Sequence, residues 1–141
     1  MMRFILDTSV CMCWLLPTEK AKDQDYAARV LTSLNNNSAL VPNLWHLEVA
    51  NVFLNAVCKS GLENSLAKTF MQKLQLLPIS TDNTTNIHAF GDTYNLATQY
   101  KLSSYDAAYL ELAARHSIPL ATLDKNLMKA CKSHGVALYH A

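Results

Sequence analysis

Short apolar runs alternate with longer stretches of helical periodicity, and this alternation restricts the fold more than any other feature of the sequence. The apolar runs end at polar or turn-forming residues and predict β-strands at residues 4–6, 39–41, 77–79, 119–123 and 136–139. The stretches around them predict helices at residues 10–16, 25–34, 44–59, 63–76, 84–100, 105–116 and 125–133. Strands that alternate with helices need crossover connections, which make the sheet parallel and cover both of its faces. We therefore predict an α/β fold, a three-layer α/β/α sandwich around a central, mostly parallel sheet of five strands.

The length and composition of the chain fit one folded domain. With 141 residues, half of them hydrophobic and 16% charged, the chain can bury one core and is too apolar for a disordered protein. We expect a single domain over residues 1–141. The 12 Lys and Arg nearly balance the 11 Asp and Glu, so the formal net charge of +1 creates no overall field that attracts nucleic acid. Any binding of nucleic acid must therefore be local.

The sequence also predicts the cellular compartment of the protein. Asp7 interrupts the apolar run near the N-terminus and no small-residue cleavage site follows, so we do not expect a signal peptide. No stretch reaches the roughly 20 apolar residues that a membrane-spanning helix needs. We expect a cytoplasmic protein without a membrane partner.

Two classes of site are excluded by the residues available. The three glycines are far apart, which leaves no glycine loop that could cradle a phosphate or a dinucleotide. The four cysteines have none of the paired spacings of zinc modules. What remains is a set of acidic residues at positions where burial is expected.

Two of these acids directly follow predicted strands. Asp7 ends the first apolar run, Asp124 ends the run at residues 119–123, and each precedes a helix. Open α/β sheets bind their ligands at the carboxyl ends of parallel strands, so both acids are candidate site residues. Asp is also a good helix N-cap residue, and capping alone could explain both positions.

Two further acids lie within predicted helices. The helix at residues 44–59 is otherwise apolar and has one polar stripe, made of Glu48, Asn51, Asn55 and Lys59. This stripe faces either solvent or a cleft. Asp106 falls on the apolar side of its helix, where a lone acid would be costly. The alternative explanation for Asp106 is a capping box with Ser103.

Acids that share a cleft become compatible when they bind a cation, because its charge reverses their mutual repulsion. Carboxylates without His or Cys partners suit hard, oxygen-binding ions, so Mg²⁺ or Mn²⁺ is favoured over zinc. Such ions keep water ligands and bind phosphate, and phosphoryl transfer is their characteristic chemistry. The sequence thus favours a Mg²⁺ or Mn²⁺ site with phosphoryl-transfer activity.

Four segments carry a resemblance to a known family, in the order FILDTSV, PNLWHLEVANVF, SSYDAAYLELAARHSIPLATLDKNL and GVAL. Together they cover essentially the whole chain and resemble the PIN domain, especially the toxin ribonucleases of bacterial VapBC-type toxin–antitoxin modules. The resemblance implies that the family's catalytic, metal-binding quartet is Asp7, Glu48, Asp106 and Asp124. It also implies that Ser9 and Thr122 are the small hydroxyl residues that support this quartet. Asn51, on the same stripe as Glu48, is a further candidate supporting residue.

The same resemblance implies an activity and partners. It predicts a metal-dependent endoribonuclease that cleaves RNA phosphodiester bonds, forms a homodimer and is silenced by a small cognate antitoxin. The C-terminal segment of the antitoxin would dock into the active cleft. Apolar surface on the predicted helix at residues 63–76 also favours a dimer.

Three lysines are the candidates for contact with the substrate. Lys125, Lys129 and Lys132 share one face of the helix that follows Asp124, where they could bind phosphates beside the metal. An ordinary solvated helix face is the alternative explanation.

Two other functions remain open. A Mg²⁺-dependent phosphatase with an aspartate nucleophile also places an acid after the first strand, but it needs a second acid two residues later, where Ser9 stands. A catalytically silent PIN-like module that binds RNA or protein is the non-enzyme alternative, and the intact set of acids argues against it.

Overall fold

The computed structural model describes the whole chain, residues 1–141. Its strands are β1 (Arg3–Leu6), β2 (Ser38–Val41), β3 (Ile79–Thr81) and β4 (Leu120–Ala121). They form one sheet in the order β3-β2-β1-β4, and every neighbouring pair is parallel. The helical elements are α1 (Thr8–Cys11), a 3₁₀ turn η1 (Met12–Trp14), α2 (Ala21–Ser33), α3 (Trp45–Ser60), α4 (Asn64–Leu74), α5 (Thr85–His88), a wide turn η2 (Ala89–Thr93), α6 (Tyr94–Tyr100), α7 (Ser104–His116) and α8 (Lys125–His134).

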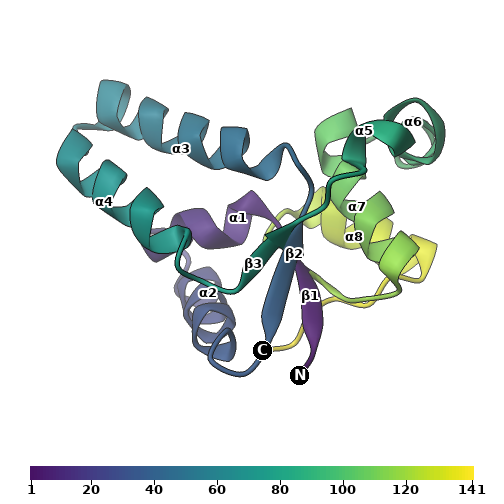
Figure 1. The fold of residues 1–141 in the computed structure, drawn as a ribbon, viewed down its shortest axis with the longest axis horizontal. Helices are drawn as coiled ribbons and strands as arrows, with labels where there is room; N and C mark the ends of the chain where they lie inside the picture. The colour runs from purple at the N-terminus through teal and green to yellow at the C-terminus, as the bar shows by residue number, and fades with distance from the viewer.

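The sheet lies between two groups of helices, as Figure 1 shows. Helices α1 to α4 lie on one side of the strands, and α5 to α8 lie on the other. The predicted α/β fold with a parallel sheet flanked by helices is therefore confirmed. No helix is both long enough and apolar enough to cross a membrane.

The predicted number of strands was wrong, because the sheet has four strands and not five. The segment predicted as the last strand lies parallel to β4 but makes only one bridge, between Leu120 and Leu138. Since β4 is only two residues long, it offers this segment too few partners for a ladder. The predicted helix at residues 84–100 is also interrupted, because Gly91 takes a non-helical conformation within η2 and separates α5 from α6.

Strand β1 occupies the position that matters for the site. Phe4, Ile5 and Leu6 are fully buried, because β1 has a strand on each side and helices over both faces. The crossover from β1 to β2 runs on one side of the sheet, whereas the connection that leads to β4 runs on the other (Figure 1). A crevice at the carboxyl ends of the strands is expected where the connections change sides. Asp7 follows β1 at this point.

Candidate active site

Asp7 is buried at the carboxyl end of β1, with 5% of its surface exposed. Its Oδ2 accepts hydrogen bonds from Ser9 Oγ at 2.6 Å and from Thr122 Oγ1 at 2.8 Å. The residue stands at the N-cap position of α1, but its side chain makes no capping hydrogen bond. Helix capping therefore does not explain Asp7, and its Oδ1 is left without a partner within the chain.

Ser9 and Thr122 do more than orient Asp7. The Ser9 hydroxyl accepts a hydrogen bond from the backbone N–H of Leu123 at 2.9 Å, and the Thr122 hydroxyl accepts one from the N–H of Asp124 at 3.1 Å. The bond to Ser9 ties the segment after β4 to the segment after β1, whereas the bond to Thr122 lies within the segment after β4. The two residues predicted to support the acids thus lie in direct contact with Asp7.

Glu48 reaches from α3 toward the same end of the sheet. Its Oε1 accepts hydrogen bonds from Tyr109 Oη at 2.5 Å and from Thr8 Oγ1 at 3.2 Å, whereas its Oε2 has no partner within the chain. Tyr109 is fully buried, and this burial raises the pKa of its hydroxyl far above the ordinary value, with the charges of Asp7 and Glu48 adding to the effect. The hydroxyl therefore keeps its proton and acts as a donor to Glu48.

Sequence reasoning missed Thr8 and Tyr109. Two signals were available, because Thr8 is adjacent to Asp7 and Tyr109 lies one helical turn after Asp106 on α7. With these two residues included, Asp7 and Glu48 have the same pattern of hydrogen bonds. One oxygen of each carboxylate is held by two hydroxyl groups, and the other oxygen is available to a ligand.

Asp106 and Asp124 lie at the N-termini of α7 and α8. Asp124 caps α8, because its Oδ1 accepts a hydrogen bond from the N–H of Leu127 at 2.9 Å. The capping explanation is thus correct for one oxygen of Asp124. On α7 the cap is Ser103, whose hydroxyl accepts a hydrogen bond from the Asp106 N–H at 3.1 Å, and Asp106 makes no reciprocal bond to the Ser103 backbone. Only half of the predicted capping box forms, although the Ser103 hydroxyl also lies close enough to the Asp106 carboxylate to lower its pKa.

The four acids form one electrostatic cluster. Burial raises the pKa of Asp7 to about 6 against the opposing hydrogen bonds of Ser9 and Thr122, and the charges of Asp106 and Glu48 raise it further. Burial also raises the pKa of Asp106, and the charges of Asp124 and Glu48 raise it further against the opposing hydrogen bond of Ser103. Each acid therefore lies close enough to another acid for the charge of one to raise the pKa of the other. None of the four forms an ion pair with a basic side chain.

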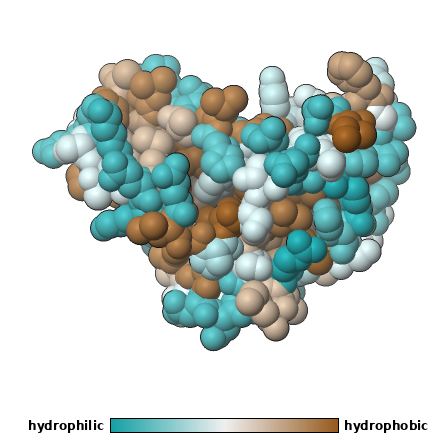
Figure 2. Space-filling model, viewed as in Figure 1, coloured by the Kyte–Doolittle hydropathy of each residue, from teal (hydrophilic) through white to brown (hydrophobic).

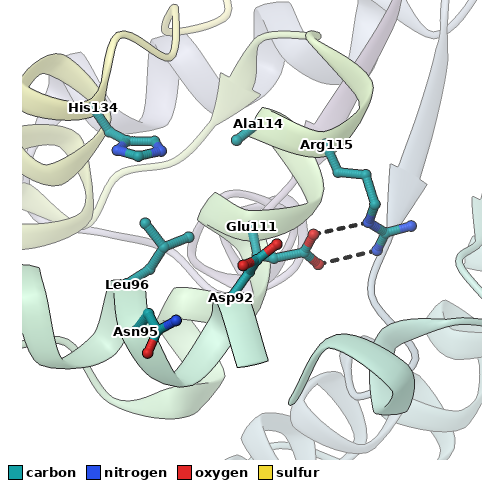
Figure 3. A pocket seen from close by; sticks show the side chains of 7 residues that line it. All are labelled: Asp92, Asn95, Leu96, Glu111, Ala114, Arg115 and His134. Carbon is teal, nitrogen blue, oxygen red and sulfur yellow. Dashed lines mark hydrogen bonds and ion pairs between the residues drawn. The ribbon is translucent and has the colours of Figure 1, made fainter. Parts of the chain in front are cut away.

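Elsewhere in the chain, buried acids do have a basic partner. Asp82 follows β3, and Glu111 lies on α7; both are buried, and both bind the Arg115 guanidinium, each at 2.8 Å. Figure 3 shows the two contacts between Arg115 and Glu111 beside a cavity of about 420 Å³. Burial raises the pKa of Asp82, but the hydrogen bonds of Arg115 and of the threonines that follow Asp82 outweigh it and hold the pKa well below its usual range. Sequence reasoning missed this network, although Glu111 and Arg115 have the spacing of a helical ion pair.

The absence of a basic partner at the four acids bears on metal binding. The four carboxylates have no basic partner, and Asp7 and Glu48 each offer one oriented oxygen without a partner, which suits the charge and chemistry of a hard cation. No three Asp, Glu, His or Cys side chains are close enough together to hold a metal ion by themselves. Mg²⁺ is commonly bound by one or two carboxylates together with water and substrate phosphate, so the residues fit an ion of this kind.

The remaining predicted site residues lie at the surface. Asn51 is exposed on α3 and its side chain makes no hydrogen bond, so its supporting role stays a prediction. Lys125, Lys129 and Lys132 all lie on α8, which begins directly after Asp124, and none of them is buried. Their contact with a substrate also stays a prediction.

The structure is similar to several solved structures of low sequence identity. One is PAE2754 from Pyrobaculum aerophilum, with a TM-score of 0.63 and 18% identity over 92% of this chain and 86% of that one. FitAcB from Neisseria gonorrhoeae has a TM-score of 0.58 and 19% identity over 99% and 97% of the two chains. VapBC2 from Rickettsia felis, bound to a DNA fragment from its promoter, has a TM-score of 0.61 and 15% identity over 98% of both chains. At these identities the likeness shows the fold.

The comparison of sequences gives the family. No curated protein matches the chain. The model of the PIN domain matches residues 4–133, which include all four acids and both supporting hydroxyl residues. PIN domains are generally nucleases that use divalent metal ions. Because the match covers nearly the whole sequence, the chain belongs to the PIN domain family.

Proposed function

We propose that this protein is a Mg²⁺- or Mn²⁺-dependent endoribonuclease and the toxin of a VapBC-type toxin–antitoxin pair. The observation that carries the proposal is the contrast between two groups of acids. Asp82 and Glu111 share Arg115. In the other group, the charges of Glu48, Asp106 and Asp124 raise the pKa of Asp7 or of Asp106, and none of these four acids has a basic partner. An uncompensated acidic cluster at the ligand-binding edge of an α/β sheet is suited to divalent metal and phosphate chemistry.

The residues around the cluster have separate tasks in this proposal. Ser9 and Thr122 orient Asp7 so that its Oδ1 points to a ligand, and Thr8 and Tyr109 do the same for Oε2 of Glu48. Asp106 and Asp124 complete the negative charge that attracts the ion. A bound Mg²⁺ or Mn²⁺ supplies an activated water and stabilises the charge that develops on the phosphate.

The proposed partners follow from the family and from the neighbouring structures. RNA is the proposed substrate, and Lys125, Lys129 and Lys132 are the proposed contacts to its phosphates. Two of the similar structures contain proteins named as pairs, FitAcB and VapBC2. We infer that this chain also pairs with a small antitoxin and forms a homodimer, in the cytoplasm.

Cleavage of RNA by the purified chain tests the proposal. We expect discrete fragments of single-stranded RNA with Mg²⁺ or Mn²⁺, no fragments with EDTA, and none from the Asp7→Asn variant, which loses a ligand charge at nearly constant volume. Asp92→Asn is the matched control, because Asp92 is exposed and outside the cluster. A DNA strand of the same sequence tests the preference for RNA.

Two outcomes would count against the proposal. If well-folded protein without a bound antitoxin leaves RNA intact in both metals, the silent binding module becomes the better explanation. Cleavage by Asp7→Asn at the rate of the wild type would show that the acidic cluster is not the active site.

A further inference from the structure

We propose that a polar cavity between the end of α6 and one face of α8 binds a phosphate of the RNA backbone, next to the cleavage site. The cavity has a volume of about 340 Å³ and is lined by Tyr100, Lys101, Asn126, Lys129, Ala130 and Ser133. This inference rests on the proposed action on RNA and adds a second point of contact to it. It extends the contacts proposed for α8 to residues of another helix.

The lining suits an anion in both charge and hydrogen bonding. Lys101 and Lys129 carry positive charges, and neither forms an ion pair. Asn126 and Ser133 add an amide and a hydroxyl group that can donate hydrogen bonds. No carboxylate lines the cavity, so nothing in it opposes the binding of a phosphate.

The backbone at Lys101 has an uncommon conformation. Lys101 ends α6 with φ 56° and ψ 44°, in the left-handed region that favours glycine. Gly61 and Gly135 occupy the corresponding positions at the ends of α3 and α8. A bulky residue in this conformation is strained, and such strain concentrates at functional sites.

The local fold explains why the strained turn cannot relax. The backbone N–H groups of Lys101 and Leu102 both donate to the carbonyl oxygen of Ala97, and Leu102 packs against the core. A left-handed residue is therefore required at this position. Glycine would adopt this backbone conformation with less strain than lysine. The stability of the turn therefore does not explain why the residue is a lysine.

The wall of the cavity is held in place by a side-chain contact between the two helices. The Tyr100 hydroxyl and His134 Nδ1 are 2.9 Å apart, which joins the end of α6 to the end of α8. Along the chain, the lining residues are near the acids, because Asn126 is in the first turn of α8, which Asp124 caps, and Lys101 is five residues before Asp106. We place a phosphate next to the scissile one in this cavity on that basis.

The decisive variant is Lys101→Gly, because it removes the charge while relieving the strained backbone. We expect its melting temperature to equal or exceed that of the wild type. The matched control is Ser117→Gly, which relieves the other left-handed non-glycine residue, φ 53°, without loss of charge. A second control is Lys68→Gln, an exposed lysine on α4, which lies on the opposite side of the sheet (Figure 1).

Binding is measured by fluorescence anisotropy with a short labelled single-stranded RNA and the full chain in EDTA. Metal-free conditions prevent cleavage, so failure of this inference is distinguishable from failure of the proposed nuclease activity. We expect Lys101→Gly and Lys129→Gln each to weaken binding about five-fold at about 0.1 M salt, and each to reduce the slope of log K against log salt by about 0.7. Both controls should bind like the wild type.

Three results would overturn the inference. The first is RNA binding by Lys101→Gly at the affinity and salt slope of the wild type. The second is an equal loss in Lys68→Gln, which would indicate diffuse attraction by any lysine. The third is competition by inorganic phosphate that is equally effective against wild type and Lys101→Gly, which would place phosphate recognition elsewhere.

Discussion

At the scale of single residues, hydroxyl groups decide what the carboxylates can do. In each of two acids, Asp7 and Glu48, one carboxylate oxygen accepts hydrogen bonds from a pair of hydroxyl groups and the other oxygen has no partner. Because a hydroxyl donor fixes the rotation of a carboxylate, the unoccupied oxygen is held in one direction before any ligand arrives. Such preorganisation is what a metal or water site requires.

Asp7 should lower the stability of the metal-free protein. Its folded pKa of about 6 lies above the value of roughly 3.9 for an unfolded chain, so the ionised form is disfavoured by folding. The stability of the folded state therefore falls as the pH rises from about 4 to 6, and the full cost of about 2 to 3 kcal/mol is present above that range. Asp7→Asn should gain this amount at pH 7.5 in EDTA and gain nothing near pH 4.

Urea unfolding at both pH values measures this effect. The Asp92→Asn variant provides the comparison, since Asp92 is exposed and its loss should leave the free energy of unfolding unchanged. An Asp7→Asn protein less stable than the wild type at pH 7.5 would contradict the account of a destabilising buried charge.

Tyr109 should affect metal binding through Glu48. Tyr109→Phe removes only the hydroxyl that donates to Glu48, so we expect the fold to persist and the affinity for Mn²⁺ to fall about ten-fold or more. Tyr26→Phe is the matched control, because its hydroxyl donates to the Tyr139 carbonyl oxygen away from the acids. Titration of Mn²⁺ followed by electron paramagnetic resonance distinguishes the two, and equal affinities would remove Tyr109 from the site.

At the scale of elements, one arginine joins parts of the chain that the sheet does not connect. Arg115 on α7 binds Asp82, which follows β3, and Glu111 on the preceding turn of its own helix. Asp82 also accepts hydrogen bonds from Thr84 and Thr85 at the start of α5. The network thus attaches α5 to α7.

Loss of this arginine should be costly. Arg115→Met leaves two buried carboxylates without a partner, and removal of one member of such a group typically costs about 3 to 5 kcal/mol. The comparison is Arg29→Met, whose ion pair with Asp25 is exposed and should contribute well under about 1 kcal/mol. Denaturant unfolding of both variants measures the difference.

The pH dependence of this effect has a defined sign. The pKa of Asp82 is lowered by folding, so its contribution to stability is fully present above the unfolded value of roughly 3.9 and is lost as the pH falls toward the folded value. The deficit of Arg115→Met should therefore shrink in acid. A deficit that is constant between neutral and strongly acidic pH would show that the charges are not its cause.

At the scale of the whole molecule, apolar side chains remain uncovered. Figure 2 shows hydrophobic surface over α3, where Leu47 is 77% exposed. Phe90, in η2, is fully exposed, and Ile87 and Tyr94 beside it are also exposed. The exposed residues Ile87, Phe90 and Tyr94, which are close together along the chain, indicate a surface for protein contacts.

The proposed homodimer can be tested on the free chain. We expect light scattering to give twice the mass of one chain at tens of micromolar, and Phe90→Lys to shift the equilibrium toward the monomer, because a charge cannot be buried without a partner. Lys22→Gln, an exposed lysine on α2, serves as the control for a surface change outside the apolar residues. A monomeric wild type at this concentration would exclude the homodimer of the free chain.

The sequence by itself determined the layers of the fold and the positions of the acids. Strand and helix periods are local properties, and strand-end positions follow from them, so the pattern of residues was enough to place Asp7 and Asp124 at the carboxyl edge of the sheet. Order along the chain was also enough to align the family motifs. The fifth strand does not form because β4 offers too few backbone partners, and the helix breaks because of the conformation of Gly91 alone. Periodicity reveals neither of these.

Only the tertiary structure decided which acids are compensated and which are not. Arg115 meets Asp82 across 33 positions, and Tyr109 meets Glu48 across 61, so neither contact has a spacing that a local pattern could disclose. Asp82 follows a strand just as Asp7 does, yet it is neutralised by an arginine while Asp7 is held by hydroxyl groups. The difference arises because electrostatic and hydrogen-bonding partners are set by distance in space, which exists only once the helices have packed on the sheet.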